Sequence, residues 1–224
     1  PIIAGALGFA FPDRPKRLRE GFTTAVTLAT LVIAVLIFLS PEMRFQTAGL
    51  NFFPAARFLD FYSYQFSSFL IMFASLFGFL ISHYSMRYME GKGRLREYYP
   101  YILLTVGAAN GALLSDNFLP FLGFWGIILV TLFLFTTIGS QDASPKKIFD
   151  SANKTLMILG GAEIALILGV GCLWYLSNTL TLSEVSIPLQ GGGTIAIVAL
   201  VLVMIGAIAK AGAMPLHSWI PSMA

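Results

Sequence analysis

The sequence predicts an all-α protein, a polytopic bundle of transmembrane helices in which one helix breaks after Lys210. Of its 224 residues, 57% are hydrophobic and only 11% are charged, whereas about 25% of the residues in a soluble domain are charged. The apolar residues gather into stretches close to the roughly 20 residues that a helix needs to cross the hydrocarbon core. This composition excludes a disordered chain, a secreted disulfide scaffold and a nucleic-acid-binding protein.

Six apolar stretches qualify as membrane spans, and we expect each to form one helix. Residues 1–11 are also apolar but too short to span, and we expect them to be the last half of a helix. A cleaved signal peptide is not expected, because the charged residues follow this stretch instead of preceding it. We therefore expect residues 1–224 to form one transmembrane domain, the N-terminal part of a longer subunit. The six expected spans are residues 21–40, 66–86, 98–114, 118–138, 154–176 and 194–211.

The connections between the spans carry an uneven charge. Ten Lys and Arg residues follow residues 1–11, 66–86 and 118–138, whereas the opposite connections hold only Arg44 and Arg57. By the positive-inside rule, the basic side faces the cytoplasm and the N-terminus lies outside, which we expect in a prokaryotic plasma membrane. Basic connections can also bind anionic lipid or nucleic acid, but a topology signal is the simpler interpretation.

Two connections on the outer side are long. Residues 41–64 mix apolar and polar residues, and we expect a hairpin or a surface segment. Residues 177–193 end in three glycines, which indicate a flexible loop and lack the Lys and Ser/Thr of a phosphate-binding loop. Within the third span, Gly107 and Gly111 form a small-xxx-small face that lets helices approach closely, and Asn110 is expected to form an interhelical hydrogen bond.

Ionisable residues inside the spans are the candidates for function, because burying a charge in the bilayer is costly. Glu163 and Lys210 each lie among apolar residues, and counting residues places them at comparable depth. A carboxylate and an amine at one depth can neutralise each other and exchange protons, although a static ion pair is the alternative. Lys154 is a further candidate for proton transfer, but near the end of its span it can also extend its amine to the interface.

The chain should break just after Lys210. Gly212 tolerates an unusual backbone and Pro215 lacks the N–H that a helix needs. His217 follows two residues later, and an imidazole can both accept and donate a proton. A lone His is more often a packing residue, but beside a broken helix and a buried lysine it is a candidate proton relay.

The segment AKAGAMPLHSWIP, residues 209–221, resembles the signature of antiporter-like proton-translocating subunits. These subunits occur in respiratory complex I, membrane-bound hydrogenases, formate hydrogenlyases and multi-subunit sodium/proton antiporters. The segments 85–90 and 115–119 resemble the same family. The resemblance implies that Lys210 lies in a broken helix and shuttles protons.

The sequence departs from the family pattern at two acidic positions. The family has a glutamate in its fifth helix where this chain has Gly126, and an aspartate where this chain has Ser222. Glu163 lies near the place where many members carry an acid in the sixth helix. Either Glu163 has replaced the missing carboxylate, or the subunit no longer pumps.

The resemblance leaves three functions open. The first is a subunit that moves protons or other cations within a multi-subunit redox-driven complex, using Lys210, Glu163, His217 and Lys154. The second is a non-pumping structural or coupling subunit, and the third is a sodium/proton antiporter or bicarbonate-uptake subunit. The chain offers no ligand set for haem, flavin or clusters, and its single Cys172 cannot hold a cluster alone. We therefore expect no cofactor in this chain, and we expect other membrane subunits, lipid and protons or sodium ions as partners.

Overall fold

The structure is a computed structural model that describes residues 1–9, 16–40, 42–46, 60–90, 94–138, 144–185 and 193–223. It is almost entirely helical, and five of its helices are long and apolar enough to cross a membrane. The all-α transmembrane fold predicted from the sequence is therefore confirmed. In chain order the helices are α1 (Ile2–Gly8), α2 (Lys16–Leu39), α3 (Gln65–Tyr88), α4 (Leu95–Leu114), α5 (Phe118–Ile138), α6 (Pro145–Ser177), α7 (Gly193–Ala211) and α8 (Trp219–Met223).

The span expected at residues 98–114 forms as α4 but is not among the five apolar helices. Its sequence carries Arg96, Glu97 and Asn110, which lower its hydropathy. It packs against α1, α2, α3 and α5. Tyr99, Leu103 and Ala108 are at most 1% exposed. A helix enclosed by protein can carry small and polar residues that a lipid-facing helix cannot.

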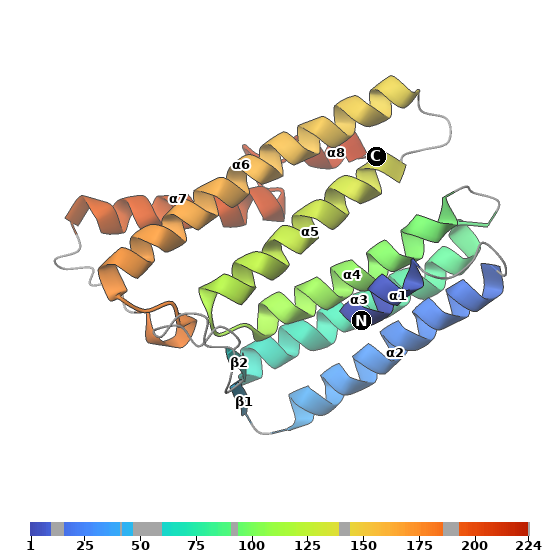
Figure 1. The fold of residues 1–224 in the computed structure, drawn as a ribbon, viewed down its shortest axis with the longest axis horizontal. Coiled ribbons are helices and arrows are strands. Elements are labelled where there is room, and N and C mark those ends of the chain that lie inside the picture. Colours follow the sequence, from blue (N-terminus) through green and yellow to red (C-terminus); the bar gives the residue numbers. More distant parts are fainter. Residues whose placement is uncertain are drawn as a thin grey trace.

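The helices form two groups connected through α5 (Figure 1). Helices α1 to α4 pack together, while α6 packs against α5, α7 and α8. Glycines let the helices approach closely where the small-xxx-small face was expected. A Cβ at Gly107 would lie 2.6 Å from Ile2 of α1, and one at Gly111 would lie 2.7 Å from Phe124 of α5. The expected interhelical bond is also present, from Asn110 Nδ2 to Ser75 Oγ at 2.9 Å.

The first long connection contains the expected hairpin. Strand β1 (Met43–Gln46) pairs antiparallel with β2 (Asp60–Ser63), so that Arg44 lies opposite Tyr62. Residues 47–59 between them lie outside the described residues.

The second long connection differs from the flexible loop that we expected, as far as it is described. After α6 the chain pairs Thr181 with Asn117 and forms a 3-10 turn at Leu182–Glu184. The N–H of Leu182 donates to the carbonyl oxygen of Asp116 at 2.8 Å. These bonds fix residues 178–185 against the turn between α4 and α5, whereas the first two of the three glycines lie outside the described residues.

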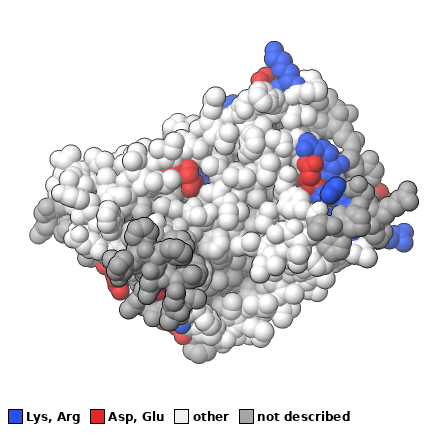
Figure 2. All heavy atoms as spheres, in the orientation of Figure 1, with Lys and Arg blue, Asp and Glu red and all other residues white. Residues whose placement is uncertain are grey.

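On the face drawn in Figure 2, few charged side chains lie across the middle of the helices. Figure 2 shows a wide uncharged surface across the helices, with one small charged spot on it. Lys and Arg gather at the end where α4 and α6 begin. This distribution matches a bundle whose middle faces hydrocarbon and whose ends face water.

Candidate functional site at the break in α7

Lys210 lies in the last turn of α7, and its side chain reaches across to α5. Its amine donates a hydrogen bond to the backbone carbonyl oxygen of Trp125 at 2.8 Å. The same nitrogen lies 4.7 Å from the centre of the Trp125 ring, within the range of a cation–π contact. A lysine in an apolar bundle is thus held by a carbonyl dipole and an aromatic face.

Glu163 lies on α6 and points toward the same part of α5. A Cβ built at Gly126 would lie 3.8 Å from Glu163 Oε1, with no other heavy atom that near. The position where the family pattern has its glutamate therefore adjoins the Glu163 carboxylate directly. The sequence alone raises Glu163 as a substitute for the missing acid, and this distance supplies the geometric basis for it.

Close packing of α6 on α7 brings Glu163 and Lys210 to the same level. A Cβ at Gly206 would lie 2.8 Å from Leu166 Cβ, and one at Gly169 would lie 2.9 Å from Val203. Because Lys210 follows Gly206 by about one helical turn, it arrives beside the turn of α6 that carries Glu163.

Glu163 and Lys210 form no N–O contact within 4.0 Å in the described part of the chain. The amine of Lys210 instead donates its hydrogen bond to the backbone carbonyl of Trp125. The arrangement differs from a closed ion pair, because a movement of either side chain changes the distance between the charges.

The helix breaks after Lys210, as the sequence predicts. Helix α7 ends at Ala211, and Gly212 adopts a φ of 65° that favours glycine. The indole N–H of Trp219 donates to the carbonyl oxygen of Ala209 at 3.0 Å, and this bond satisfies one of the carbonyls that the break leaves open.

His217 lies between α7 and α8, at the break. Its Nδ1 is buried and has no hydrogen-bond partner among the described residues. The structure thus places an unsatisfied imidazole nitrogen in the broken segment that follows Lys210.

Lys154 is not part of this group. Its side chain is exposed, and it borders a hollow of about 310 Å³ together with other residues at the start of α6. Lys154 precedes Glu163 by nine residues, or roughly 13 Å along the helix. The structure therefore brings together Lys210 and Glu163, places His217 at the break and leaves Lys154 at the end of the bundle.

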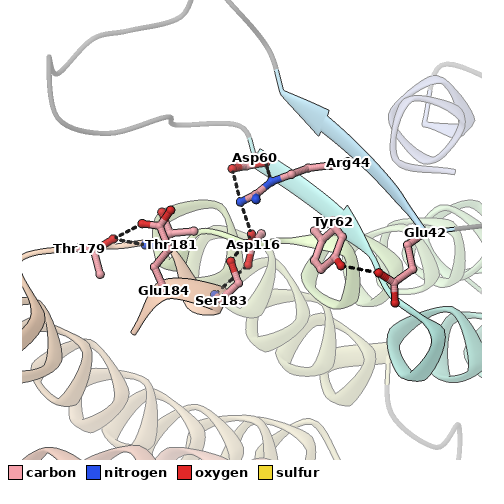
Figure 3. Close-up of polar contacts among 9 residues, drawn as sticks. All are labelled: Glu42, Arg44, Asp60, Tyr62, Asp116, Thr179, Thr181, Ser183 and Glu184. Carbon is pink, nitrogen blue, oxygen red and sulfur yellow. Dashed lines mark hydrogen bonds and ion pairs between the residues drawn. The ribbon is translucent and has the colours of Figure 1, made fainter. Parts of the chain in front are cut away.

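A polar cluster that the sequence did not predict lies at the end of the bundle opposite Lys154 (Figure 3). Arg44 of β1 donates to Asp60 of β2 at 3.1 Å and to Asp116 of the α4–α5 turn at 2.7 Å. Asp116 also accepts bonds from the backbone N–H and the hydroxyl of Ser183, at 3.0 and 2.8 Å. The hydrogen bond to Asp60 raises the pKa of Arg44 above its usual value, so Arg44 remains charged.

We refer to Arg44, Asp60, Asp116 and Ser183 as the outer clasp. Asp60 and Asp116 are 1% and 5% exposed, and only a folded structure shows that one arginine reaches both. The sequence signal was weak, because Asp116 was noted only within the segment 115–119 and Arg44 only in the count of basic residues. The clasp connects the hairpin, the α4–α5 turn and the segment after α6.

The described residues contain no group of three or more His, Cys, Asp and Glu residues that could hold a metal ion.

Comparison with known proteins finds a family match in the second half of the chain. Residues 115–224 match the family described as the transmembrane part of NADH:quinone oxidoreductase and Mrp antiporter subunits. The match covers 110 of the 224 residues. The resemblance inferred from the segment 209–221 is thereby confirmed.

The chain also resembles individual proteins over nearly its whole length. It is 21% identical to a protein of the Na(+)/H(+) antiporter of Bacillus subtilis, over 99% of this chain and 44% of that protein. Its fold matches a chain of the membrane-bound sulfane sulfur reductase, an archaeal respiratory complex, with a TM-score of 0.83 and 18% identity. It matches a chain of the Mrp complex of Dietzia sp. with the same TM-score and 20% identity.

Both structural matches cover 100% of this chain. They cover 45% of the matched chain of the sulfane sulfur reductase and 41% of the matched chain of the Mrp complex. The chain thus spans less than half the length of these three proteins. The structural likeness shows the shared fold, and the matched family shows an integral membrane protein.

Proposed function

We propose that this chain is part of a membrane subunit that translocates protons or other cations, with Lys210 as the central proton carrier. The observation that carries the proposal is the placement of Lys210 at a helix break, held by the Trp125 carbonyl beside a half-buried carboxylate. Ionisable groups at such depth are costly and usually serve transport. The family match and the Na(+)/H(+) antiporter relative support the same class of activity.

Each site residue has a role in the proposed path. Glu163 is the charge partner of Lys210, and a proton gained or lost at one group changes the electrostatic energy at the other. His217, with its unsatisfied Nδ1, is the onward relay beyond the break. Lys154 stands at the end of the path toward the basic side, where it can exchange protons with water. The chain's own residues move the proton, and the driving force comes from neighbouring subunits.

The partners of this proposed subunit are other membrane subunits, since the structural matches are chains of multi-subunit membrane complexes. We place the basic ends of α4 and α6 on the cytoplasmic side of a plasma membrane, as the positive-inside rule requires. The N-terminus then lies on the outer side, and no redox cofactor is assigned to this chain.

The experiment is ion translocation into vesicles by the assembled native complex, with wild type compared with Lys210→Ala and Glu163→Gln. We expect each variant to lose translocation on the order of 10²-fold, the range typical of removing a positioned proton-transfer group. Asp150→Asn, which removes an exposed acid from the same helix as Glu163, should leave the rate unchanged. Unchanged translocation by correctly assembled Lys210→Ala would refute the proposal and leave a structural subunit.

A second experiment tests the carboxylate alone. Glu163→Ala should abolish translocation, and adding Gly126→Glu should restore part of it, because a side chain at position 126 starts 3.8 Å from the present carboxylate oxygen. The matched control is Gly126→Gln with Glu163→Ala, which supplies the same shape without the acid. Equal activity of the Glu and Gln double variants would show that no carboxylate is needed there.

Sodium/proton antiport is the second candidate, because the relative matched over 99% of this chain is named as part of such an antiporter. The two candidates differ in what drives the ions. A pH change in the vesicles that follows an imposed sodium gradient without any electron donor favours antiport. A pH change that needs the donor favours a redox-driven pump.

A further inference from the structure

The first turns of α6 form a basic hollow, of which the proposed ion path uses only Lys154. The hollow has a volume of about 310 Å³, and its lining residues come from one helix and its cap: Ser144, Lys146, Lys147, Asp150, Ser151 and Lys154. These residues recur at three- and four-residue spacing, so they share one face of the helix. Three lysines against one aspartate leave the hollow with excess positive charge.

The lysines of this hollow have no acidic partner within the described part of the chain. The ion pairs seen there include those of Arg44 with Asp60 and Asp116, far from this hollow. Asp150 lies on the same face, but among the described residues it forms no ion pair within 4.0 Å with any of the three lysines. The excess charge of the hollow is therefore available to a ligand.

The hollow lies at the depth of lipid headgroups. Helix α6 has 33 residues and is about 50 Å long, whereas the hydrocarbon core is about 30 Å thick. Residues 156–175 form a stretch of that thickness whose only charged residue is Glu163. Lys154 and the residues before it must then lie at or beyond the boundary of the core.

An apolar surface runs from this hollow toward the middle of the bundle. Met157, one turn beyond Lys154, is 76% exposed, and Ile164, two turns further along the same face, is 62% exposed. A polar anion bound by the lysines would thus continue into apolar atoms that suit a hydrocarbon chain. A free anion would make no use of these side chains.

We propose that the start of α6 is a binding site for an anionic phospholipid. The lysines bind the phosphate of the headgroup, and an acyl chain lies along Met157 and Ile164. Near an anionic surface each lysine contributes roughly fivefold to binding. The site shares Lys154 with the proposed path, but lipid retention is measured apart from translocation, so a failure of lipid binding would leave the proposed function untouched.

The test measures how tightly the assembled native protein retains phosphatidylglycerol, by native mass spectrometry and by titration in phosphatidylcholine vesicles. We expect Lys147→Gln with Lys154→Gln to weaken retention roughly fivefold per lysine. The charge-preserving pair Lys147→Arg with Lys154→Arg should retain the lipid. Arg17→Gln with Arg87→Gln removes two exposed cations from α2 and α3 and should leave the measured site unaffected.

Three outcomes would overturn the proposal. The first is equal retention of phosphatidylglycerol by the two Gln pairs. The second is equally tight binding of inorganic phosphate that displaces the lipid, which would make the hollow a site for free phosphate. The third is a zero-length crosslink between Lys154 and a carboxylate of a neighbouring subunit in the native complex, which would show that protein covers the hollow.

Discussion

Lys210 and Trp125 contact each other in two ways, through a 2.8 Å hydrogen bond to the Trp125 carbonyl and through the indole ring 4.7 Å away. The first contact depends only on the backbone of α5, whereas the second depends on the side chain. Trp125 is itself in contact with Phe121 one turn earlier, at 5.1 Å between ring centres. The ring that faces the lysine therefore also packs against Phe121.

This double contact predicts a graded response at position 125. Trp125→Phe retains an aromatic face and the carbonyl, so translocation should fall only a few-fold, since the ring contact is worth about 0.5–2 kcal/mol. Trp125→Leu removes the aromatic face and should lower translocation further, although the carbonyl remains. The rates are measured in vesicles with the assembled complex. Equal activity of the Phe and Leu variants would show that the ring does not act on Lys210.

The outer clasp predicts a stability effect far from Lys210. Asp116→Asn weakens the bond to Arg44, and the buried site loses one of its two negative charges while Asp60 stays in place. We expect the free energy of unfolding to fall by about 1–3 kcal/mol, the cost of breaking buried polar pairs. Thermal unfolding in detergent measures it. Glu184 is an exposed acid next to Ser183, and Glu184→Gln should change the melting temperature little. An equal shift in the Asp116 and Glu184 variants would argue against the clasp.

The sequence predicted the helices well and the contacts between them poorly. Hydropathy located α2, α3, α5, α6 and α7, because lipid requires long apolar segments wherever a helix faces it. The same rule explains why the central α4 is less apolar.

Glu163 and Lys210 were found from the sequence because charges within apolar runs are conspicuous. Their mutual placement and the role of Trp125 were not, since a helix that is apolar on all sides does not reveal its rotation. The clasp was missed for a related reason. Arg44 and Asp116 are 72 residues apart and lie in polar connections, where charges attract no notice.

Tyr99 gives a prediction for the buried polar contacts at the basic end. Its hydroxyl donates to Glu20 Oε1 at 3.1 Å, and Tyr99 is 1% exposed. Tyr99→Phe leaves the carboxylate without this donor and should cost about 1–3 kcal/mol of stability. Tyr98→Phe is the control, because the hydroxyl of Tyr98 forms its hydrogen bond with the hydroxyl of Ser85 and not with a carboxylate. Denaturation in detergent should rank Tyr99→Phe as the more damaging change.

Glycine substitutions separate the packing of α7 from the chemistry of the site. Gly206→Ala puts a Cβ 2.8 Å from Leu166 Cβ and 3.3 Å from the Ala162 carbonyl, so α7 must move away from α6. Lys210 follows one turn later and should shift relative to Glu163, which lowers translocation even though no charged group has changed.

Gly126→Ala is the matched substitution on α5. Its Cβ meets only Glu163 Oε1 at 3.8 Å, and alanine is favoured over glycine in a helix by about 1 kcal/mol. We expect Gly126→Ala to retain stability and translocation and Gly206→Ala to lose both, measured on the same assembled complex. If Gly206→Ala translocates like wild type, close packing of α6 on α7 does not set the distance between the charges. If Gly126→Ala loses translocation instead, the space beside Glu163 must stay empty, either for water or for movement of the carboxylate.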